Sequence, residues 1–570
     1  MNSVPRKLAQ EAVSTSIGGA TPAEQDLSFR LVDALKHLGV RWAFGVSGGG
    51  IARVWRAVIE GLDQVHFSHE QGAAFAAIEM SVATGDPVVV YTTTGPGITN
   101  AITGLVAARY EGARLILISP RTSPAQRGLV AVQETPGMMP SGDLFNAGWL
   151  FDDVFAVDAP EELETCLYRL EQRLLLRGPY LAHISIPVGL QNDAVGPLRL
   201  GSAASVHPAA PDAEAVALVA DRLQGRRFFV WVGHGARRAY PQVRELVERT
   251  GSPVVATPRG KGIVSDRDPH LVMVGGLGGH LAGSQLAAYK AEVGLVLGSR
   301  LGEASGGWDS DIVPAGGLIQ VDEAPGPFGP AGDLRMTVQG DVGQFLEMLI
   351  PLLDRSGNQP RFPSPYPRFP RARKAPGVRP QYLMGALERH LIARDCPILV
   401  EPGSAMAWAT HWIKVPEPGL LRLPSQFGSM GHMTCGVVGR ALAGPGPAAC
   451  LTGDGSMLMA EEVHTAVDRG VRAIWIVLND ARYTMVEAGM SANAPFGSQA
   501  RFTRCDFSQL AQGWGAASVV VEQEDKVDSA LEAALASGGP CIVDIRIDPN
   551  QIAPFGARLN SLARQQGGTS

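Results

Sequence analysis

The sequence predicts an α/β protein made of three doubly wound units, each built around a parallel sheet. Apolar strand-like runs alternate with helical patterns along most of the chain, which is typical of parallel sheets with helices on both faces. The length of 570 residues is too great for one hydrophobic core and fits three domains of about 170 to 190 residues. The composition, 45% hydrophobic and 18% charged, suits a large globular protein of this class. We place an N-terminal tail at residues 1–22, the three units at residues 23–198, 205–350 and 381–570, and a linker at residues 351–380.

Composition also argues against several classes of function. A net charge of −6 spread over this length does not fit a nucleic-acid-binding surface. No run of about 18 apolar residues occurs, so no membrane span is expected. The N-terminal tail is polar and lacks the apolar core of a signal peptide. The six cysteines are scattered without a CxxC pair, which favours a reducing, cytoplasmic location and argues against a thiolate metal site.

The first unit opens with a helical pattern at residues 23–38, a strand at residues 41–44 and a glycine-rich turn at residues 45–50. That turn lacks GxGxxG spacing, and no acidic residue closes the next strand, so it is weak evidence for a dinucleotide site. Further strands are expected at residues 65–67, 88–91, 115–118 and 181–186.

Glu70 follows the strand at residues 65–67 and opens a helix of small residues at 72–84. By itself, a glutamate at this place is usually a carboxylate that the helix dipole stabilises. A Gly-Pro-Gly sequence at residues 95–97 predicts a rigid turn before a helix. Gln133, taken alone, is no more than a polar surface residue.

The middle unit repeats the pattern, with strands expected at residues 228–232, 254–256, 293–297 and 318–321. Asp322 follows the last of these strands, where it could meet a ribose or cap a helix. The glycines within residues 275–279 leave room for a phosphate. We favour a structural role for this unit, with a bound nucleotide as the alternative. The linker carries seven prolines between residues 354 and 380, which predicts an extended crossover between domains.

The last unit holds the most informative stretch. An apolar strand at residues 448–452 runs into Gly453-Asp454-Gly455-Ser456, and a second strand at residues 473–478 runs into Asn479-Asp480. The glycine turn lets backbone N–H groups face a phosphate, and Asp454 offers a hard oxygen ligand for Mg²⁺ or Ca²⁺. A second oxygen ligand is expected at the carboxyl end of the next strand, where ligands collect in parallel sheets. The stretch predicts a metal-diphosphate clamp, although the GDG turn alone is equally well explained as an ordinary strand–helix turn.

Taken together, these motifs resemble those of the thiamine-diphosphate (ThDP) enzymes, in the group of acetolactate synthase, pyruvate oxidase and benzaldehyde lyase. The resemblance runs in order over nearly the whole chain. Its members carry a GDG followed about two dozen residues later by paired asparagines. Two departures occur: Asp480 stands at the second asparagine, and 23 residues separate Gly455 from Asn479, which is one short. Further matches are Ser68-His69-Glu70-Gln71, the turn Thr94-Gly95-Pro96-Gly97-Ile98-Thr99-Asn100 (similar to SGPGATN), Ala131-Val132-Gln133-Glu134 (AFQE), Phe427-Gly428-Ser429-Met430-Gly431 (GxMG), and the middle-unit stretches PVVATPRGKG and GLVLGSRL.

The resemblance implies roles for individual residues. It identifies the first and last units as the pyrimidine-type and diphosphate-type ThDP-binding domains. Glu70 would hold the proton that activates the aminopyrimidine, and Gln133 would face the bound substrate. Met430 would wedge the cofactor into its bent form, and the Gly428 carbonyl would accept from its amino group. The diphosphate and metal contacts would come from Gly403, Ser404, Asp454, Gly455, Ser456, Asp480 and the carbonyl of Arg482, with Asn479 as the fallback ligand for Asp480.

The activity implied is that of a ThDP- and Mg²⁺-dependent carboligase, which decarboxylates a 2-oxo acid and transfers the acyl unit to a second carbonyl. The chain lacks the paired-histidine motif of one decarboxylase branch, and Val486 stands where that branch has its glutamate. Glu487 is expected to be solvated or ion-paired. The family's domains meet across a subunit boundary, which implies a homodimer or homotetramer.

Several alternatives stay open. They are a decarboxylase without ligase activity, an acyloin-cleaving lyase, a nucleotide-binding oxidoreductase, and a catalytically silent scaffold that the altered clamp would explain. FAD in the middle unit is a further option that we do not favour.

Overall fold

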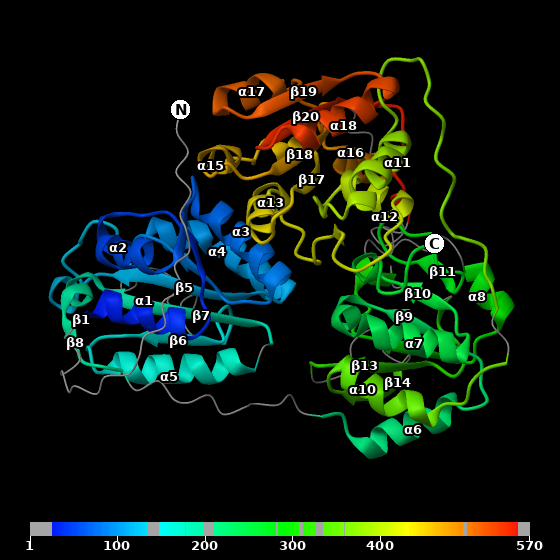
Figure 1. Ribbon diagram of the computed structural model, residues 1–570, viewed down its shortest axis with the longest axis horizontal. Helices are drawn as coiled ribbons and strands as arrows, with labels where there is room; N and C mark the ends of the chain where they lie inside the picture. Colours follow the sequence, from blue (N-terminus) through cyan, green and yellow to red (C-terminus); the bar gives the residue numbers. More distant parts are fainter. Residues whose placement is uncertain are drawn as a thin grey trace, which may run out of the picture.

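The computed structural model of the chain describes residues 25–134, 148–176, 178–198, 210–280, 283–306, 312–324, 334–357, 360–493 and 499–556. The predicted N-terminal tail therefore lies outside the described residues. Three six-stranded sheets dominate the described structure, and every pairing within them is parallel. The predicted α/β class with three doubly wound units is confirmed. Figure 1 shows the first unit in blue and cyan, the central unit in green, and the last unit in yellow to red against both of them.

The first sheet has the strand order β3-β2-β4-β5-β7-β6. Its inner strands are almost wholly buried, and β4 (Val88–Tyr91) is buried at every position, because helices cover both faces and leave no polar side. The remaining strands are β2 (Trp42–Gly45), β3 (Asp63–His66), β5 (Arg114–Arg121), β6 (Asp153–Ala156) and β7 (Tyr180–Pro187). The helices are α1 (Leu27–His37), α2 (Ala52–Gly61), α3 (Glu70–Thr84), α4 (Pro96–Glu111) and α5 (Glu162–Leu175).

The predicted start of the first helix is wrong. Residues 25–26 form a short strand, β1 (Gln25–Asp26), which pairs antiparallel with β8 (Ala194–Val195). The Asp26 side chain then accepts a hydrogen bond from the Phe29 N–H and caps α1, so the helix begins at Leu27. The predicted helical pattern began before this cap, at residue 23. The pairing of residues 25–26 with a strand far along the chain sets the later start of the helix.

The central sheet has the order β11-β10-β9-β12-β13-β14. Its strands are β9 (Phe228–Val232), β10 (Val254–Ala256), β11 (Leu271–Val274), β12 (Val293–Leu297), β13 (Leu318–Asp322) and β14 (Leu334–Gln339). Its helices are α6 (Ala213–Leu223), α7 (Tyr240–Thr250), α8 (Gly283–Tyr289), α9 (Glu303–Gly306) and α10 (Val342–Leu349), with the 3₁₀ segment η5 (His234–Ala239) after β9.

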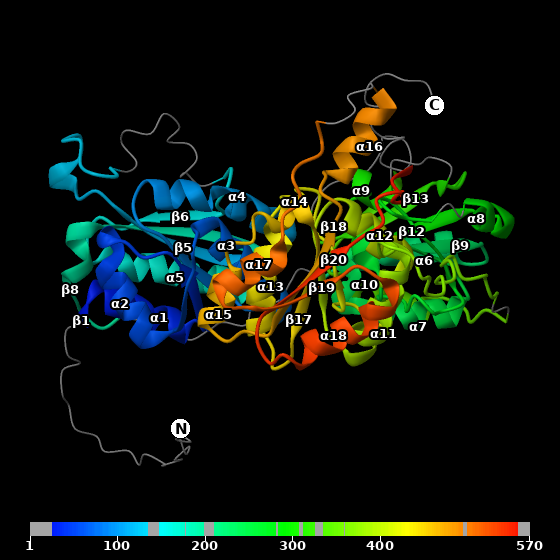
Figure 2. The same cartoon turned by 90° about the horizontal axis from the view of Figure 1, so that it is seen from above.

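The last sheet has the order β16-β15-β17-β18-β20-β19. Its strands are β15 (Ile398–Val400), β16 (Leu421–Arg422), β17 (Ala448–Gly453), β18 (Ala473–Asn479), β19 (Ala517–Val521) and β20 (Cys541–Arg546). Its helices are α11 (Pro380–His390), α12 (Ser404–Trp412), α13 (His432–Leu442), α14 (Asp454–Met457), α15 (Val463–Asp468), α16 (Thr484–Asn493), α17 (Phe507–Trp514) and α18 (Val527–Ala536). Figure 2 shows α16 projecting away from the body of this unit.

The first and last units of the chain share one hydrophobic core, centred on the contact of α3 with α13. Small residues make the contact close: a side chain at Gly439 would collide with the carbonyl oxygen of Ala76. The Phe75 ring stacks on His432 with the ring centroids 4.9 Å apart. This packing fixes α3, and with it the position of Glu70 at its first turn.

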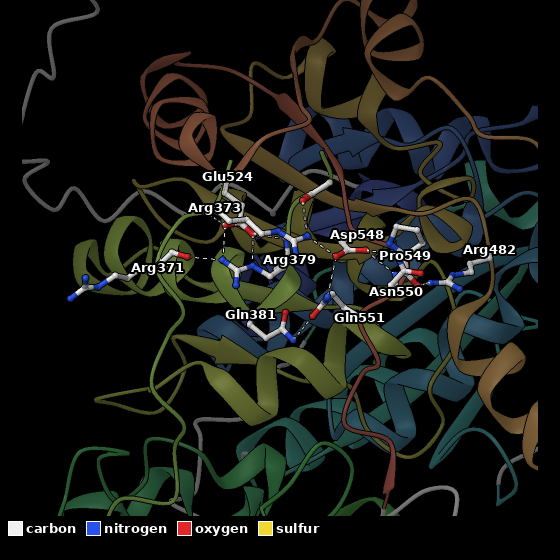
Figure 3. A network of polar contacts seen from close by, with 11 residues as sticks. Arg371, Arg373, Arg379, Gln381, Arg482, Glu524, Asp548, Pro549, Asn550 and Gln551 are labelled. Atoms are coloured by element: carbon white, nitrogen blue, oxygen red, sulfur yellow. Dashed lines mark hydrogen bonds and ion pairs between the residues drawn. The ribbon is translucent and has the colours of Figure 1, made fainter. Parts of the chain in front are cut away.

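The segment between the central and last units is extended and polar, and ion pairs hold it to the last unit (Figure 3). Within residues 360–379 it forms neither helix nor strand apart from an isolated bridge at Val378. Arg379 Nε donates to the buried Glu524 carboxylate at 2.7 Å, and Arg373 Nη2 donates to Asp548 at 2.6 Å. No helix in the described part of the chain is long and apolar enough to cross a membrane.

Candidate active site

The GDG turn and the end of β18 meet at the carboxyl edge of the last sheet. Strands β17 and β18 are neighbours, with Gly453 paired to Leu478, so the residues that follow them lie side by side. Asp454 is buried, and its Oδ2 accepts from the backbone N–H of Asp480 at 3.0 Å and from that of Ala481. Its Oδ1 accepts from the Gly455 N–H at 2.8 Å. The structure thus brings Asp454 and Asp480 together.

Arg482 contributes a side chain whose role the sequence did not indicate. Its Nε donates to Asp480 Oδ2 at 2.7 Å, where Thr484 Oγ1 also donates at 3.0 Å. The same guanidinium pairs with Glu487 at 2.9 Å. It also donates to the carbonyl of Pro549, as Figure 3 shows. Glu487 also pairs with Arg501 at 2.8 Å, so this glutamate is ion-paired, as expected.

The donor set at this edge fits a divalent cation. Burial, followed by the nearby charge of Asp480, raises the pKa of Asp454 to about 7. Two carboxylates this close repel each other in a poorly solvated site, and a cation between them would remove that cost. No group of three His, Cys, Asp or Glu residues suited to a metal occurs in the described part of the chain. Mg²⁺ in proteins is ordinarily bound by one or two carboxylates, and phosphate and water oxygens complete its coordination shell.

Asn479, the fallback ligand, has its amide nitrogen bonded elsewhere. It is fully buried, and its Nδ2 donates to Asp544 Oδ1 at 2.9 Å and to the carbonyl of Cys505 at 3.1 Å. These bonds hold its amide nitrogen, while its buried Oδ1 accepts no hydrogen bond within the described part of the chain, so Asn479 stays available as the fallback ligand beside Asp480.

Beside the two aspartates lies an open cradle at the start of α12. Gly403 has φ of +114°, and no atom lies within 4 Å of the place where a Cβ would stand. Ser404 then begins α12, whose free backbone N–H groups favour an anion. The space beside Gly455 is filled, unlike that beside Gly403, because a Cβ at Gly455 would collide with the Tyr483 ring. The next residue, Ser456, is buried.

A cavity of about 490 Å³ opens from this cradle. Gly428, with φ of +58°, forms part of its wall together with Gly403, and Met430 lies half-buried two residues further along the same loop. The described residues that line it come from the central and last units alone: Leu277, Gly302, Glu303, Ala304, Pro402, Gly403, Met406, Pro424, Ser425, Gln426, Phe427, Gly428 and Met485.

Glu70 lies at the first turn of α3 and does not line this cavity. It is buried, with 6% of its surface exposed, and its Oε2 accepts from Asn100 Nδ2 at 3.1 Å. Gly97 keeps the space beside it open, since a Cβ there would stand 3.1 Å from Glu70 Oε1. His69 caps the helix, its Nδ1 accepting from the Gln71 N–H at 3.1 Å, which is a structural role.

Glu462 is a buried residue of this region that sequence reasoning missed. Its two carboxylate oxygens accept from the backbone N–H groups of Ser68 and His69, both at 3.1 Å. Burial raises the pKa of Glu462 to about 7. Gly72 leaves the room it needs, because a side chain there would collide with Glu462 Oε1. The sequence does offer one signal for this residue, since Glu462 is the second of two glutamates in a mainly apolar stretch after the GDG turn. Its hydrogen-bond partners, however, lie nearly 400 residues earlier in the chain.

Gln133 lies in an exposed loop with φ of +58°. Thr94 Oγ1 donates to its Oε1 at 3.2 Å, which ties the loop to the turn before α4. Residues Leu129, Val130 and Val132 of the same loop expose 72%, 79% and 92% of their surface.

The central sheet has its own cavity, of about 530 Å³, at the carboxyl ends of its strands. Gly235, Ser299 and Asp322 contribute to its wall, together with Arg109 and Tyr180 of the first unit. Asp322 Oδ1 accepts from the Ala324 N–H at 3.0 Å, so this residue both caps a turn and borders the cavity.

Comparison with known proteins gives matches along the chain. Residues 25–140 match the N-terminal TPP binding domain of thiamine pyrophosphate enzymes, residues 216–349 the central domain, and residues 401–545 the C-terminal TPP binding domain. The Escherichia coli (strain K12) acetolactate synthase isozyme 2 large subunit is 26% identical, with 91% of this chain and 95% of that protein covered. The isozyme 1 large subunit of the same organism is 25% identical, with 91% and 94% covered.

The similarity extends to solved structures. Benzoylformate decarboxylase from Polynucleobacter necessarius superposes with a TM-score of 0.83 at 18% identity, covering 93% of this chain and all of that one. At this identity the likeness shows the fold. Together, the three family matches, which follow one another in the order of the three sheets, and the full-length relatives show that this chain is an enzyme of the thiamine pyrophosphate family.

Proposed function

We propose that the protein is a ThDP- and Mg²⁺-dependent carboligase that acts on a 2-oxo acid donor and a second carbonyl compound. One observation carries the choice of ligation over simple protonation. Among the described residues lining the cavity beside the cradle, Glu303 is the single ionisable side chain, and the rest are apolar, small or amide-bearing. Such a wall offers few groups that could deliver a proton to the acyl unit, and it has room for a second substrate.

Bound ThDP would supply the electron sink that lets a 2-oxo acid lose CO₂ and its acyl carbon attack a carbonyl. Asp454, Asp480 and the carbonyl of Arg482 would hold Mg²⁺, and Gly403 and Ser404 at the start of α12 would bind the diphosphate, with Gly455 and Ser456 beside the ion. Met430 would support the bend between the two rings, and the Gly428 carbonyl would accept a hydrogen bond from the amino group.

Glu70 would hold the proton at the aminopyrimidine ring. Its burial and its bond to Asn100 fix the carboxyl in one orientation, which suits a group that shares a proton at a defined atom. Gln133, in its exposed loop, would contact the substrate. The low polarity around the cavity would exclude water from the reacting carbon.

We further propose that the working form is at least a homodimer, and that two such dimers assemble into a homotetramer. The cavity wall lacks any described residue of the first unit, and Glu70 stands outside it. A second copy could bring its Glu70 to this cavity. The exposed apolar loop with Leu129, Val130 and Val132 and the projecting α16, where Val486 is 52% exposed, would be covered in that assembly.

We also propose that the protein is cytoplasmic and that it holds no flavin. All six cysteines are free thiols, as expected in a reducing compartment. Flavin remains the alternative occupant of the cavity at the central sheet, and its absorbance in the purified protein would decide the point.

The experiment is turnover by protein reconstituted with ThDP and Mg²⁺. A panel of 2-oxo acids is supplied with and without aldehyde or 2-oxo acid acceptors, and CO₂ and condensed products are measured by mass spectrometry. We expect one condensed product per CO₂ with the wild type, and a loss of at least 100-fold with Glu70→Gln. Glu161→Gln, an exposed glutamate before α5, serves as the matched control. An aldehyde as the main product would favour a decarboxylase without ligase activity. Cleavage of an added acyloin would favour a lyase, and normal ThDP binding without turnover would favour a catalytically silent scaffold.

A further inference from the structure

A third cavity, of about 380 Å³, lies where all three units of the chain meet. It is bordered by the end of α3, by η5 of the central unit, and by the segment before β16 together with the end of α13. Its position separates it from the proposed ThDP site. His432 begins α13 directly after the loop that carries Gly428 and Met430, and Arg440 lies eight residues later, about 12 Å along the helix axis.

The side chains of this cavity are strongly cationic. Its lining holds six Lys and Arg residues and one carboxylate, Glu79, as part of the set Glu79, Val82, Ala83, Thr84, Gly85, His234, Arg237, Arg238, Tyr240, Arg259, Lys261, Pro418, Gly419, Leu421, Arg422, Leu423 and Arg440. Three of the cations have carboxylate partners. Arg422 pairs with Glu79 at 2.9 Å and Glu111 at 2.7 Å, Arg259 pairs with Glu111 at 2.7 Å, and Lys261 pairs with Asp266 at 2.7 Å.

The other three cations, Arg237, Arg238 and Arg440, have no carboxylate within ion-pair distance among the residues that the structure describes. Arg237 instead contacts the Nε2 of His234. Burial, followed by the charges of Arg422, Arg238 and Arg259, lowers the pKa of Arg237 to about 10. Positive charge therefore exceeds negative charge in this cavity, because its one lining carboxylate, Glu79, is already paired with Arg422, and a bound anion would offset the excess.

We propose that this cavity binds a small phosphorylated metabolite, whose phosphate group is held by Arg237 and Arg440 and whose organic part lies on the apolar side of the wall. Guanidinium groups bind phosphate in a bidentate manner, and two of them from different units can enclose one group. Val82, Tyr240 and Leu423 supply the apolar surface. The volume falls within the range of small-molecule sites.

Occupation of the cavity would join the three units. Arg237 belongs to the central unit, Arg440 to the last, and Thr84 and Gly85 to the end of α3 in the first. A ligand that binds the folded, docked arrangement more strongly than the separated units stabilises it by mass action. Glu70 is the first residue of α3, and Thr84 and Gly85 are at its other end. The ligand would therefore also restrain the helix that carries the proposed catalytic carboxyl.

The test uses the full chain loaded with ThDP and Mg²⁺ and freed of excess ligand, without substrate, so that its outcome is independent of the proposed activity. 3-Phosphoglycerate is the phosphate-bearing probe, and succinate is a dianion without phosphate. We expect calorimetry to show saturable binding of 3-phosphoglycerate, with a rise in melting temperature, and at least tenfold weaker binding of succinate. Arg237→Gln and Arg440→Gln should each weaken 3-phosphoglycerate binding about tenfold or more.

The control is Arg222→Gln, an exposed arginine on α6 of the central unit, which should leave binding unchanged. Circular dichroism and ThDP binding check that each variant is folded. If either of these half-buried positions does not tolerate glutamine, Arg238→Gln tests the same wall through a solvent-exposed side chain and should also weaken 3-phosphoglycerate binding. The proposal is overturned by the absence of binding at millimolar probe, by equal binding of succinate, or by full binding in the Arg237→Gln, Arg440→Gln double variant.

Discussion

Asp480 and Arg482 form a pair whose charges balance beside the proposed metal site. An aspartate in place of an amide would add a negative charge next to Asp454, and that charge already contributes to the raised pKa of Asp454. The Arg482 guanidinium lies 2.7 Å from Asp480 Oδ2 and is itself held by Glu487 and the Pro549 carbonyl. We infer that Arg482 offsets the charge of Asp480 and leaves its other oxygen for the cation.

This pairing predicts opposite effects of two substitutions on metal affinity. Asp480→Asn removes the negative charge of a proposed metal ligand, and should weaken Mn²⁺ binding in the presence of ThDP about tenfold. Arg482→Gln removes the offsetting cation and should tighten Mn²⁺ binding severalfold. Electron paramagnetic resonance of free Mn²⁺ measures both. Arg501→Gln, which removes a partner of Glu487 without touching Asp480, should change little. Weaker binding in both variants would contradict the charge-balance argument.

At the scale of elements, α13 depends on a buried carboxyl at its start. Glu401 Oε1 accepts from the backbone N–H groups of Met433 and Thr434 at 2.7 and 2.8 Å. Burial raises the pKa of Glu401 from 4.5 to about 7, although the bonds from Thr434 and Met433 and the charge of His432 act in the opposite direction. The folded protein therefore prefers the protonated carboxyl.

The resulting pH dependence has a definite sign. Below pH 4.5 both the folded and unfolded chains are protonated at this group, and above about pH 7 both have lost the proton. Between these values only the folded chain keeps it, so the contribution of Glu401 to stability falls as pH rises, by an amount on the order of 3 kcal/mol. Glu401→Gln keeps an acceptor oxygen without the titration, so its melting temperature relative to wild type should rise by a few degrees from pH 5 to pH 8.

The matched control for this measurement is Glu417→Gln, an exposed glutamate of the same unit. Its melting temperature relative to wild type should not move between the two pH values. A relative melting temperature of Glu401→Gln that stays constant, or that falls as pH rises, would contradict the argument from burial.

The contact between α3 and α13 gives a second prediction for elements. A Cβ at Gly439 would collide with the backbone carbonyl of Ala76, and backbone cannot move aside as a flexible side chain can. Gly439→Ala should force the helices apart, lower stability by about 3 kcal/mol, and reduce turnover because α3 carries Glu70. Gly446→Ala, where no atom lies within 4 Å of the new methyl group, is the control. Equal melting temperatures for the two variants would show that the helices can separate at little cost.

The elements also show what the sequence could and could not predict. Strands β4, β9, β10 and β12 have the predicted bounds, because each is a wholly apolar run between turn residues. The start of α1 was wrong because the pairing of Asp26 with β8 is not visible in local spacing. The closeness of Asp454 and Asp480 followed from their places after two adjacent strands. Glu462 was missed because its partners are backbone groups of another unit.

At the scale of the whole molecule, buried ion pairs connect the three units. Arg422 of the last unit pairs with Glu79 and Glu111 of the first, and Arg259 of the central unit also pairs with Glu111. Burial would raise the pKa of Glu79 and Glu111, but nearby cations outweigh it and hold both below the ordinary value. For Glu79 these are Arg422 and His432, and for Glu111 they are Arg259 and Arg422. Since 343 residues separate Arg422 from Glu79, no local pattern in the sequence announces this network.

Arg422→Met should therefore weaken the docking of the units more than the loss of one ion pair on the surface. It leaves the Glu79 carboxylate buried without its main partner, a change that typically costs 3–5 kcal/mol. Differential scanning calorimetry should show a lower melting temperature and a transition that splits as the units separate. Adding Glu79→Gln to Arg422→Met should restore part of the loss, because the amide carries no charge to desolvate. Arg389→Met, which breaks an exposed pair with Asp528, is the control and should have little effect. If Arg422→Met matches this control, the ion pairs contribute little to the docking of the first and last units, which then rests on the apolar contact of α3 with α13 and on the bonds of Glu462 to Ser68 and His69.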